Sequence, residues 1–516
     1  MPSHFRRRAV LAGAALSALP RGAAQAQAPA QPHTSISVRI DRDVEVLDPA
    51  FRTGLQDGNI VRAITQRLVT VAPGGKGELV PDAAAELTQV SPTEVTFRLK
   101  PGQMFSGGYG EMTADDVKFS YERFIQPGPG GKESPYKAEW ANLKEVQVTD
   151  RLSGRIILDR PRAGLFSIAL GDVAGSIVSR RAVTERGVGH NTNPVGSGPL
   201  MVTAFEKQRQ VVLRRNPAYT GQPAGFEQVA VRYVPDPKTT ELGLRSGDLD
   251  FASLPPSQAE ALRTAAGLKV EQQPGIANIW LGMNVEKPPF NDPKVRQAIR
   301  LALDVDQMLL AGFNGRAPRA NALIMPQVVG HWADAPAPKR NVAEAKRLLA
   351  EAGHAAGFKA RVLVQNQPVY QTMALVAQAL LRDVGITLEV DAQDAASFFS
   401  AGKGETGKAL DLFIIRFNGK LDPNFLAQWF TTGQIGTWNW QRWSSPEFDR
   451  LLDQGSAELD DAKRAALFVQ AQKLMEDSGA FVWLTYDVGI FIHRDWLRPA
   501  LLPSGIDWAM DRFAPA

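Results

Sequence analysis

The chain has no cysteine in its 516 residues, so it can hold no disulfide bond. A chain of this length can bury enough apolar surface to fold without such cross-links. The same absence excludes a lipoprotein anchored through a modified N-terminal cysteine. Histidine is scarce, with six in the chain, and no two have the i, i+4 spacing of metal ligands on a helix. The sequence therefore predicts no metal site and no cofactor.

Net charge and long apolar runs are lacking as well. The formal charge of +4 comes from residues 1–26, which contain four arginines and no acid; the remainder has 54 basic and 54 acidic residues. A balanced surface gives no electrostatic reason to expect a nucleic acid or an anionic membrane as partner. After residue 26, no run approaches the roughly 20 apolar residues that span a bilayer, so we expect no membrane insertion.

The first 26 residues have the organisation of a secretory signal peptide. An arginine cluster, Arg6 to Arg8, precedes a short apolar run, Ala9 to Leu19, and the small-residue site Ala24-Gln25-Ala26 follows. Arg7-Arg8-Ala9-Val10-Leu11 resembles a twin-arginine export signal, and both export routes stay open. We expect removal of residues 1–26 and a freely diffusing periplasmic protein.

Two motifs that could carry chemistry fail in their context. Residues 402–409, GKGETGKA, have the glycine spacing of a dinucleotide fingerprint, but a helical pattern precedes them and a strand pattern follows, the reverse of what phosphate binding needs. Gly196-Ser197-Gly198 lacks the frame of a strained nucleophile elbow. The sequence indicates binding rather than catalysis, and we expect no enzyme activity.

Strand and helix patterns alternate along the chain. Residues 95–99 alternate as a half-buried strand, and residues 410–415 form an apolar run typical of a buried one. Thr113, Asn341 and Ser445 each precede an apolar stripe of helical spacing and are predicted helix caps. The pattern predicts an α/β protein with mixed sheets.

Several segments, in this order, resemble the periplasmic solute-binding proteins of ABC importers, in the large family of oligopeptide, dipeptide and nickel binders. The most recognisable is VTFRLKPGQMFSGG followed by MTADDVKFSYERF, residues 95–108 and 112–124. The other segments are LDPAF (47–51), LVPDAA (79–84), PVGSGPL (194–200), RNPAY (215–219), NVEKPPFNDPKVRQAIRLALD (284–304) and WSSPEFDRLLDQG (443–455). The resemblance extends from about Ser35 to about Arg494.

The resemblance implies a type II periplasmic-binding fold, in which two lobes joined by two hinge strands enclose the ligand. It places lobe I at residues 33–275 with a C-terminal return at 491–516, lobe II at 276–490, and an extra subdomain at about 76–190. Such a protein works by hinge closure, because ligand contacts made only in the closed form shift the population toward it. The implied partners are a small or peptide-like solute and the permease subunits of an ABC importer, and the implied state is a monomer.

The resemblance also bears on which solute is bound. Peptide binders of the family use an aspartate a few residues before an Asp-Pro pair to hold the ligand ammonium; here that position falls near Gly419, and no acid lies between Asp411 and Asp422. Dipeptide binders hold the ligand carboxylate with an arginine from a loop that here reads Gln365 to Tyr370 and has none. Unmodified di- and tripeptides are therefore disfavoured, since an unpaired buried ammonium is costly.

A polar and aromatic set remains for the solute. The predicted contacts are Thr53, Gly54, Leu55, Asn278, Trp280, Gln365, Asn366, Tyr370, Arg416, Asn418, Trp438, Asn439 and Trp440. Arg416 is expected to meet a carboxylate, while the tryptophans could equally pack beneath the loop. Two other functions stay open: a binder of nickel or a metal chelate, for which no histidine falls in the expected loop, and a periplasmic enzyme.

Overall fold

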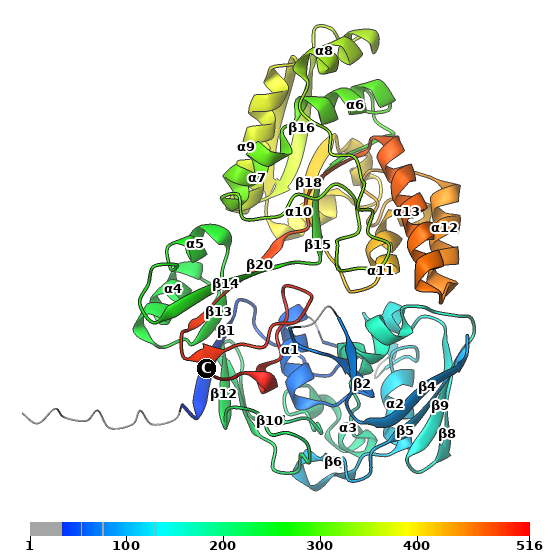
Figure 1. Ribbon diagram of the computed structural model, residues 1–516, viewed down its shortest axis with the longest axis vertical. Coiled ribbons are helices and arrows are strands. Elements are labelled where there is room, and N and C mark those ends of the chain that lie inside the picture. The colour runs from blue at the N-terminus through cyan, green and yellow to red at the C-terminus, as the bar shows by residue number, and fades with distance from the viewer. Residues whose placement is uncertain (1–32, 53, 75–76, 129–130) are drawn as a thin grey trace, which may run out of the picture. The chain divides into compact units, whose positions relative to one another are not determined.

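The computed structural model describes residues 33–52, 54–74, 77–128 and 131–516 (Figure 1). The predicted signal peptide lies outside the described residues. From Thr34 to Ala516 the chain is one compact unit. Its two largest sheets contain seven and five strands, and a third contains four.

The seven-stranded sheet combines segments that are far apart in the sequence. Its order is β10 (Leu200–Glu206), β11 (Gln210–Arg215), β12 (Gln228–Tyr233), β1 (Ser35–Ile40), β13 (Phe251–Ser253), β20 (Val488–Arg494) and β14 (Leu268–Pro274). β1 runs parallel to β12 and β13, and the other neighbours are antiparallel. Helices α1 (Leu55–Ile64), α4 (Pro237–Ser246) and α5 (Pro256–Glu260) accompany this sheet.

The five-stranded sheet has helices on both faces. Its order is β17 (Ile386–Gln393), β16 (Phe358–Gln365), β18 (Leu412–Asn418), β15 (Ala277–Met283) and β19 (Phe481–Thr485). One face carries α6 (Pro293–Ala302), α7 (Val305–Phe313), α8 (Val342–Glu351) and α9 (Pro368–Arg382). The other carries α10 (Ala395–Ala401), α11 (Pro423–Ala427), α12 (Pro446–Ala457) and α13 (Asp461–Ser478).

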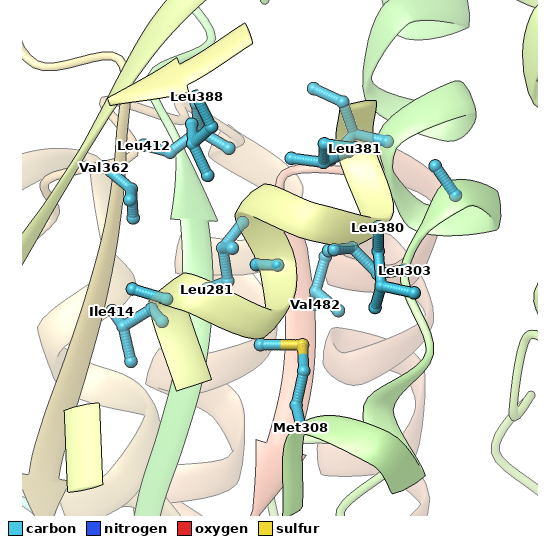
Figure 2. Packing of buried hydrophobic residues seen from close by; sticks show 14 of the residues in the cluster. Leu281, Leu303, Met308, Val362, Leu380, Leu381, Leu388, Leu412, Ile414 and Val482 are labelled. Atoms are coloured by element: carbon cyan, nitrogen blue, oxygen red, sulfur yellow. The ribbon is translucent and has the colours of Figure 1, made fainter. Parts of the chain in front are cut away.

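Alternating burial along the strands divides the five-stranded sheet into two cores. In β16, Val362 and Val364 face the first helical layer, whereas Leu363 faces the second. Figure 2 shows Leu380 and Leu381 of α9 in the first core together with side chains from the strands beneath. A sheet covered on both faces explains why residues 412–415 read as a continuous apolar run.

The four-stranded sheet contains β4 (Ala84–Ser91), β5 (Glu94–Leu99), β9 (Ser153–Leu158) and β8 (Leu143–Asp150), and α2 (Ala114–Glu122) packs on it. α3 (Arg180–Arg186) packs beside α2. In the described part of the chain, the remaining strands form three small pairs: β2 (Val69–Val71) with β3 (Leu79–Pro81), β6 (Met104–Phe105) with β7 (Gly110–Glu111), and β21 (Leu497–Arg498) with β22 (Ala514–Pro515).

The predicted elements and caps are confirmed where the structure describes them. Residues 94–99 form β5, and Asn341 and Ser445 cap α8 and α12 by accepting hydrogen bonds from backbone N–H groups. GKGETGKA follows α10 and precedes β18, the helix-before-strand order that disfavoured phosphate binding.

The chain crosses between the two large sheets twice, and the crossings are neighbours. Residues 275–276 connect β14 to β15, and residues 486–487 connect β19 to β20. Strand pairing continues on both sides, because Pro274 pairs with Val488 and Ile279 pairs with Thr485. Two adjacent connections of two residues each leave the sheets linked by a narrow strip of backbone.

Candidate functional site

A cavity of about 530 Å³ has walls from both large sheets. Arg39, Ser253 and Ile490 belong to strands of the seven-stranded sheet, and Ile279 and Arg416 to strands of the five-stranded one. The second crossing adds Asp487. A solute in this cavity would therefore contact both sheets at once.

Four of the predicted contacts line this cavity: Gln365, Tyr370, Arg416 and Asn418. Gln365 ends β16 and Asn418 ends β18, and these strands are parallel neighbours, so their carboxyl ends lie at the same edge of the sheet. Tyr370 is in the first turn of α9, which starts at Pro368 after β16. This edge, outside the carboxyl ends of parallel strands, is where open α/β sheets commonly bind ligands.

Arg416 already has a carboxylate partner within the chain. Its Nε lies 2.5 Å from Oδ2 of Asp487, and its Nη1 donates to Oδ1 of Asn418. Burial opposes the guanidinium charge, but the neighbouring Asp487 outweighs it, and the pKa of Arg416 is raised. The prediction that Arg416 meets a solute carboxylate therefore needs revision, because a carboxylate from the solute would have to compete with Asp487.

Tyr370 presents a neutral phenol to the cavity. Burial raises the pKa of Tyr370 to about 12. The hydroxyl thus keeps its proton across the physiological range and can both donate and accept a hydrogen bond. With the amides of Gln365 and Asn418, it gives this wall hydrogen-bonding capacity without net charge.

Sequence reasoning missed several residues of the cavity wall. Gln56 and Asn59 lie three positions apart on α1, the helix after the LDPAF segment, and this helical spacing was an available signal. Asp487, Asp507 and Trp508 also line the cavity. They come from a crossing and from the last segment of the chain, and no local pattern identifies them.

Four predicted contacts are buried in the interior and do not line the cavity: Asn278, Trp280, Asn439 and Trp440. Trp280 is fully buried, with ring contacts to Phe417, Phe430 and Trp483. Asn278 donates to the carbonyl oxygen of Leu323. We therefore remove these four residues from the candidate site.

The amide of Asn439 and the indole of Trp440 have structural partners. Asn439 Nδ2 donates to three backbone oxygens, those of Phe430, Thr431 and Trp443, and so holds the turn together. Trp440 donates from Nε1 to the oxygen of Thr437. The alternative that the tryptophans pack beneath the loop is the one the structure supports.

The remaining predicted contacts lie outside the cavity wall or outside the described part of the chain. Trp438 is half-buried against other rings, and Asn366 accepts a hydrogen bond from Gln371 at the start of α9. Gly54 is the N-cap of α1. Thr53 lies outside the described residues, as does the side chain of Leu55.

A second cavity, of about 160 Å³, adjoins the first. Asn418, Ile506 and Asp507 line both. Three basic and three acidic side chains line the second cavity: Arg52, Arg62, Lys420, Glu139, Asp172 and Asp507.

Lys420, in the loop after β18, reaches across to acids from another part of the chain. Its Nζ lies 2.6 Å from Oε1 of Glu139 and 2.9 Å from Oδ2 of Asp172. Asp172 is also 2.5 Å from Nη2 of Arg62, and these cations together outweigh burial and hold the pKa of Asp172 below its usual range. Because all four side chains are largely shielded, these pairs are poorly screened by salt.

No three His, Cys, Asp or Glu side chains among the described residues are grouped so that they could hold a metal ion. Within the same residues, every helix is too short or too polar to cross a bilayer.

Comparisons with known proteins identify the family. The model of the bacterial extracellular solute-binding proteins, family 5, matches residues 78–437. A probable di/tripeptide-binding protein 5 of Pseudomonas aeruginosa is 29% identical over 491 residues, which cover 89% of this chain and 91% of the relative. The probable D,D-dipeptide-binding periplasmic protein DdpA of Escherichia coli is 28% identical over 458 residues, covering 86% of each chain.

A solved structure shares the two-lobed α/β fold. The periplasmic binding protein DppA of Helicobacter pylori, in complex with the peptide STSA, superposes with a TM-score of 0.79 at 24% identity, covering 94% of this chain and 98% of that one. The family model covers well over half of the sequence. The chain therefore belongs to the bacterial extracellular solute-binding proteins of family 5, the components that capture solutes for ABC importers.

Proposed function

We propose that the 530 Å³ cavity is the solute site and that closure of the two lobes around it signals the loaded state to a permease. The observation that carries this proposal is the mixed origin of its walls, with Gln365 and Tyr370 on one side and Gln56 and Asn59 on the other. Contacts from both sides favour the closed form, because they are complete only when the lobes meet.

The lobe boundaries follow from the sheets. We propose lobe I at residues 34–275 with a return from Val488, and lobe II at residues 276–487, with the extra subdomain within 76–190. The return is placed at Val488 rather than at residue 491 because β20 is a strand of the seven-stranded sheet from its first residue. Residues 275–276 and 486–487 then act as the hinge.

The wall chemistry favours a small polar or peptide-like solute. Amide and phenol groups provide hydrogen bonds, and Arg416 with Asp487 forms a charge-compensated pair on the wall. Relatives are named for di- and tripeptides, a D,D-dipeptide and glutathione. A side chain at position 419 has no room here, because a Cβ on Gly419 would lie 2.1 Å from the oxygen of Ile276. A free peptide ammonium therefore needs an anchor other than this loop position.

The proposal also covers the release of the solute, the oligomeric state of the protein, its location and its export. A binding cavity without assigned catalytic residues fits a carrier that releases its solute unchanged. We propose that the protein acts as a monomer in the periplasm after export by a signal peptide, with the twin-arginine route as one of two open routes.

Native mass spectrometry of the protein purified from the periplasm, followed by calorimetric titration of the stripped protein with the released solute, tests the proposal. Gln365→Ala should weaken binding about 5- to 10-fold, the equivalent of one hydrogen bond. Asn366→Ala is the matched control, since the next residue in the chain does not line the cavity. A solute that binds both variants with wild-type affinity would place the site elsewhere.

A peptide panel tests the solute class. The panel compares free Ala-Ala with its N-acetylated form, which keeps the carboxylate and removes the ammonium. The acetylated form should bind at least as tightly as the free dipeptide, because the site lacks an acid at position 419. Strong preference for the free dipeptide would show that another acid, such as Asp487, anchors the ammonium.

A further inference from the structure

The smaller, 160 Å³ cavity has a buried arginine, Arg52, in its wall. Arg52 is 4% exposed, and its guanidinium stacks 3.7 Å from the ring centre of Tyr136. Its Nε and Nη1 have no hydrogen-bond partner, and the Nη1 of Arg62 also has none. Among the described residues, no carboxylate lies within ion-pair distance of Arg52.

The acids around this cavity have other partners. Asp172 pairs with Arg62 and Lys420, and Oε1 of Glu139 pairs with Lys420. Asp507 accepts a hydrogen bond from Ser504, and burial raises the pKa of Asp507, which favours its neutral form. Arg52 thus acts on Asp172 and Asp507 only through space, and its Nε and Nη1 still lack an acceptor.

A buried guanidinium N–H group without an acceptor is unfavourable, because it has lost water without gaining a partner. Among the described residues, Arg52 stacks on the ring of Tyr136, but a ring face cannot accept the in-plane hydrogen bonds of its Nε and Nη1. A bound anion would supply the missing acceptors through charge-assisted hydrogen bonds.

The cavity has the size and position for part of a solute. Its volume of about 160 Å³ exceeds the roughly 30 Å³ that one water molecule takes in the liquid, so it can hold a carboxylate with a short carbon chain. Asn418, Ile506 and Asp507 form the shared wall with the solute cavity. Oε2 of Glu139 has no hydrogen-bond partner and could accept from a hydroxyl or amine on the same chain.

We infer that the 160 Å³ cavity is an anion subsite, in which Arg52 is the charge partner of a carboxylate arm of the solute. The inference rests on the proposed function, because the body of the solute occupies the larger cavity. Both unpartnered nitrogens of Arg52 are themselves buried, so the side chain must shift to meet the anion, and its in-plane N–H groups can donate while it stays stacked on Tyr136. The subsite selects solutes that carry a carboxylate in addition to their polar body.

Bromide is a suitable probe, because it is a small anion that anomalous scattering locates. Crystals of the stripped protein soaked in sodium bromide should show an ion beside Arg52 in the wild type and none in Arg52→Gln. Arg155→Gln, an exposed position on β9, is the control and should keep the ion. A wild-type cavity without bromide, or an equal peak in Arg52→Gln, would overturn the inference.

A second measurement separates this inference from the proposed function. Arg52→Gln should weaken binding of the co-purified solute at least 10-fold, and amidation of the solute's carboxylate should weaken wild-type binding to a similar degree while leaving Arg52→Gln nearly unaffected. Full affinity in Arg52→Gln, with Gln365→Ala still impaired, would remove the subsite and leave the proposed function intact. Full affinity in both variants would remove both.

Discussion

Asp422 lies in a loop with the composition of a binding loop, but the role of its side chain is structural. It is fully buried, its Oδ1 accepts from the N–H groups of Asn424 and Phe425, and its Oδ2 lies 2.7 Å from Nη2 of Arg464. Asp422→Ala should lower the free energy of unfolding by about 3–5 kcal/mol, because it leaves Arg464 buried and unpaired. Urea denaturation followed by circular dichroism measures the loss.

Two further variants separate the charge of Asp422 from its cap. Asp422→Asn keeps an oxygen for the cap of α11 and should be less damaging than Asp422→Ala. The double variant Asp422→Ala/Arg464→Met should lose less unfolding free energy than the two single variants lose together, since no buried charge is then left without a partner. Simple additivity would show that the pair is not coupled.

His190 makes the stability of the folded protein depend on pH in the acidic range. It is 1% exposed, and burial together with Arg123 and Arg186 lowers the pKa of His190 to about 4. In the unfolded chain the imidazole of His190 takes up a proton near pH 6.5, whereas in the folded protein it does so only near pH 4. The free energy of unfolding therefore decreases as the pH falls through this range.

His190→Gln should therefore flatten the pH dependence of stability. About 3 kcal/mol of the wild-type loss between pH 7 and pH 4 comes from this one group, at 1.36 kcal/mol per unit of pKa. Urea midpoints measured at half-unit steps of pH test the expectation. Parallel curves for variant and wild type would assign the acid sensitivity to other groups.

The sequence predicted residues of the cavity wall only where a local pattern determines their position in the fold. Gln365, Arg416 and Asn418 follow apolar strand patterns and reach the cavity because the ends of parallel strands share one edge. Asp507 comes from a segment without a pattern, so only the folded chain brings it there. Trp280 and Trp440 are buried in the structure. The sequence could not indicate this, because an aromatic cluster beside a loop has the same composition whether it binds ligand or packs.

At the scale of elements, Asp116 joins two helix starts. Its Oδ2 accepts from the N–H of Thr113 at the start of α2, and its Oδ1 accepts from the N–H of Arg180 at the start of α3. Asp116→Ala should cost about 2–3 kcal/mol in unfolding free energy, because two largely shielded N–H groups lose their partner.

Thr113→Ala is the comparison for Asp116→Ala. It affects only the start of α2 and should cost about 1 kcal/mol. Hydrogen exchange adds a local measure, since the amide of Arg180 should lose protection in Asp116→Ala and keep it in Thr113→Ala. Equal protection in both variants would mean that Asp116 does not hold α3.

Element types were largely predictable, and their pairing was not. Caps and apolar stripes located α2, α8 and α12 because these signals lie within a few residues of each helix. The placement of β1 between β12 and β13 depends on residues about 190 or more positions away, and no local pattern encodes that register. The proposed boundary at Val488 likewise rests on non-local pairing, because β20 pairs with β13 and β14.

At the scale of the whole molecule, Lys420 should control the balance between open and closed forms. It lies in the loop after β18, in the proposed lobe II, whereas its partners Glu139 and Asp172 belong to the proposed lobe I. These ion pairs must break when the lobes separate. They therefore stabilise the closed form before any solute is bound.

Lys420→Met should shift the solute-free protein toward the open form, with a larger radius of gyration in X-ray scattering. Solute binding must then supply the whole free energy of closure, so affinity should fall; a loss of about 2 kcal/mol corresponds to roughly 30-fold. Lys408→Met, which removes an exposed pair with Glu405, is the matched control and should change neither quantity. An unchanged radius of gyration and affinity in Lys420→Met would mean that closure does not depend on these pairs, and the hinge strands alone would then set the balance.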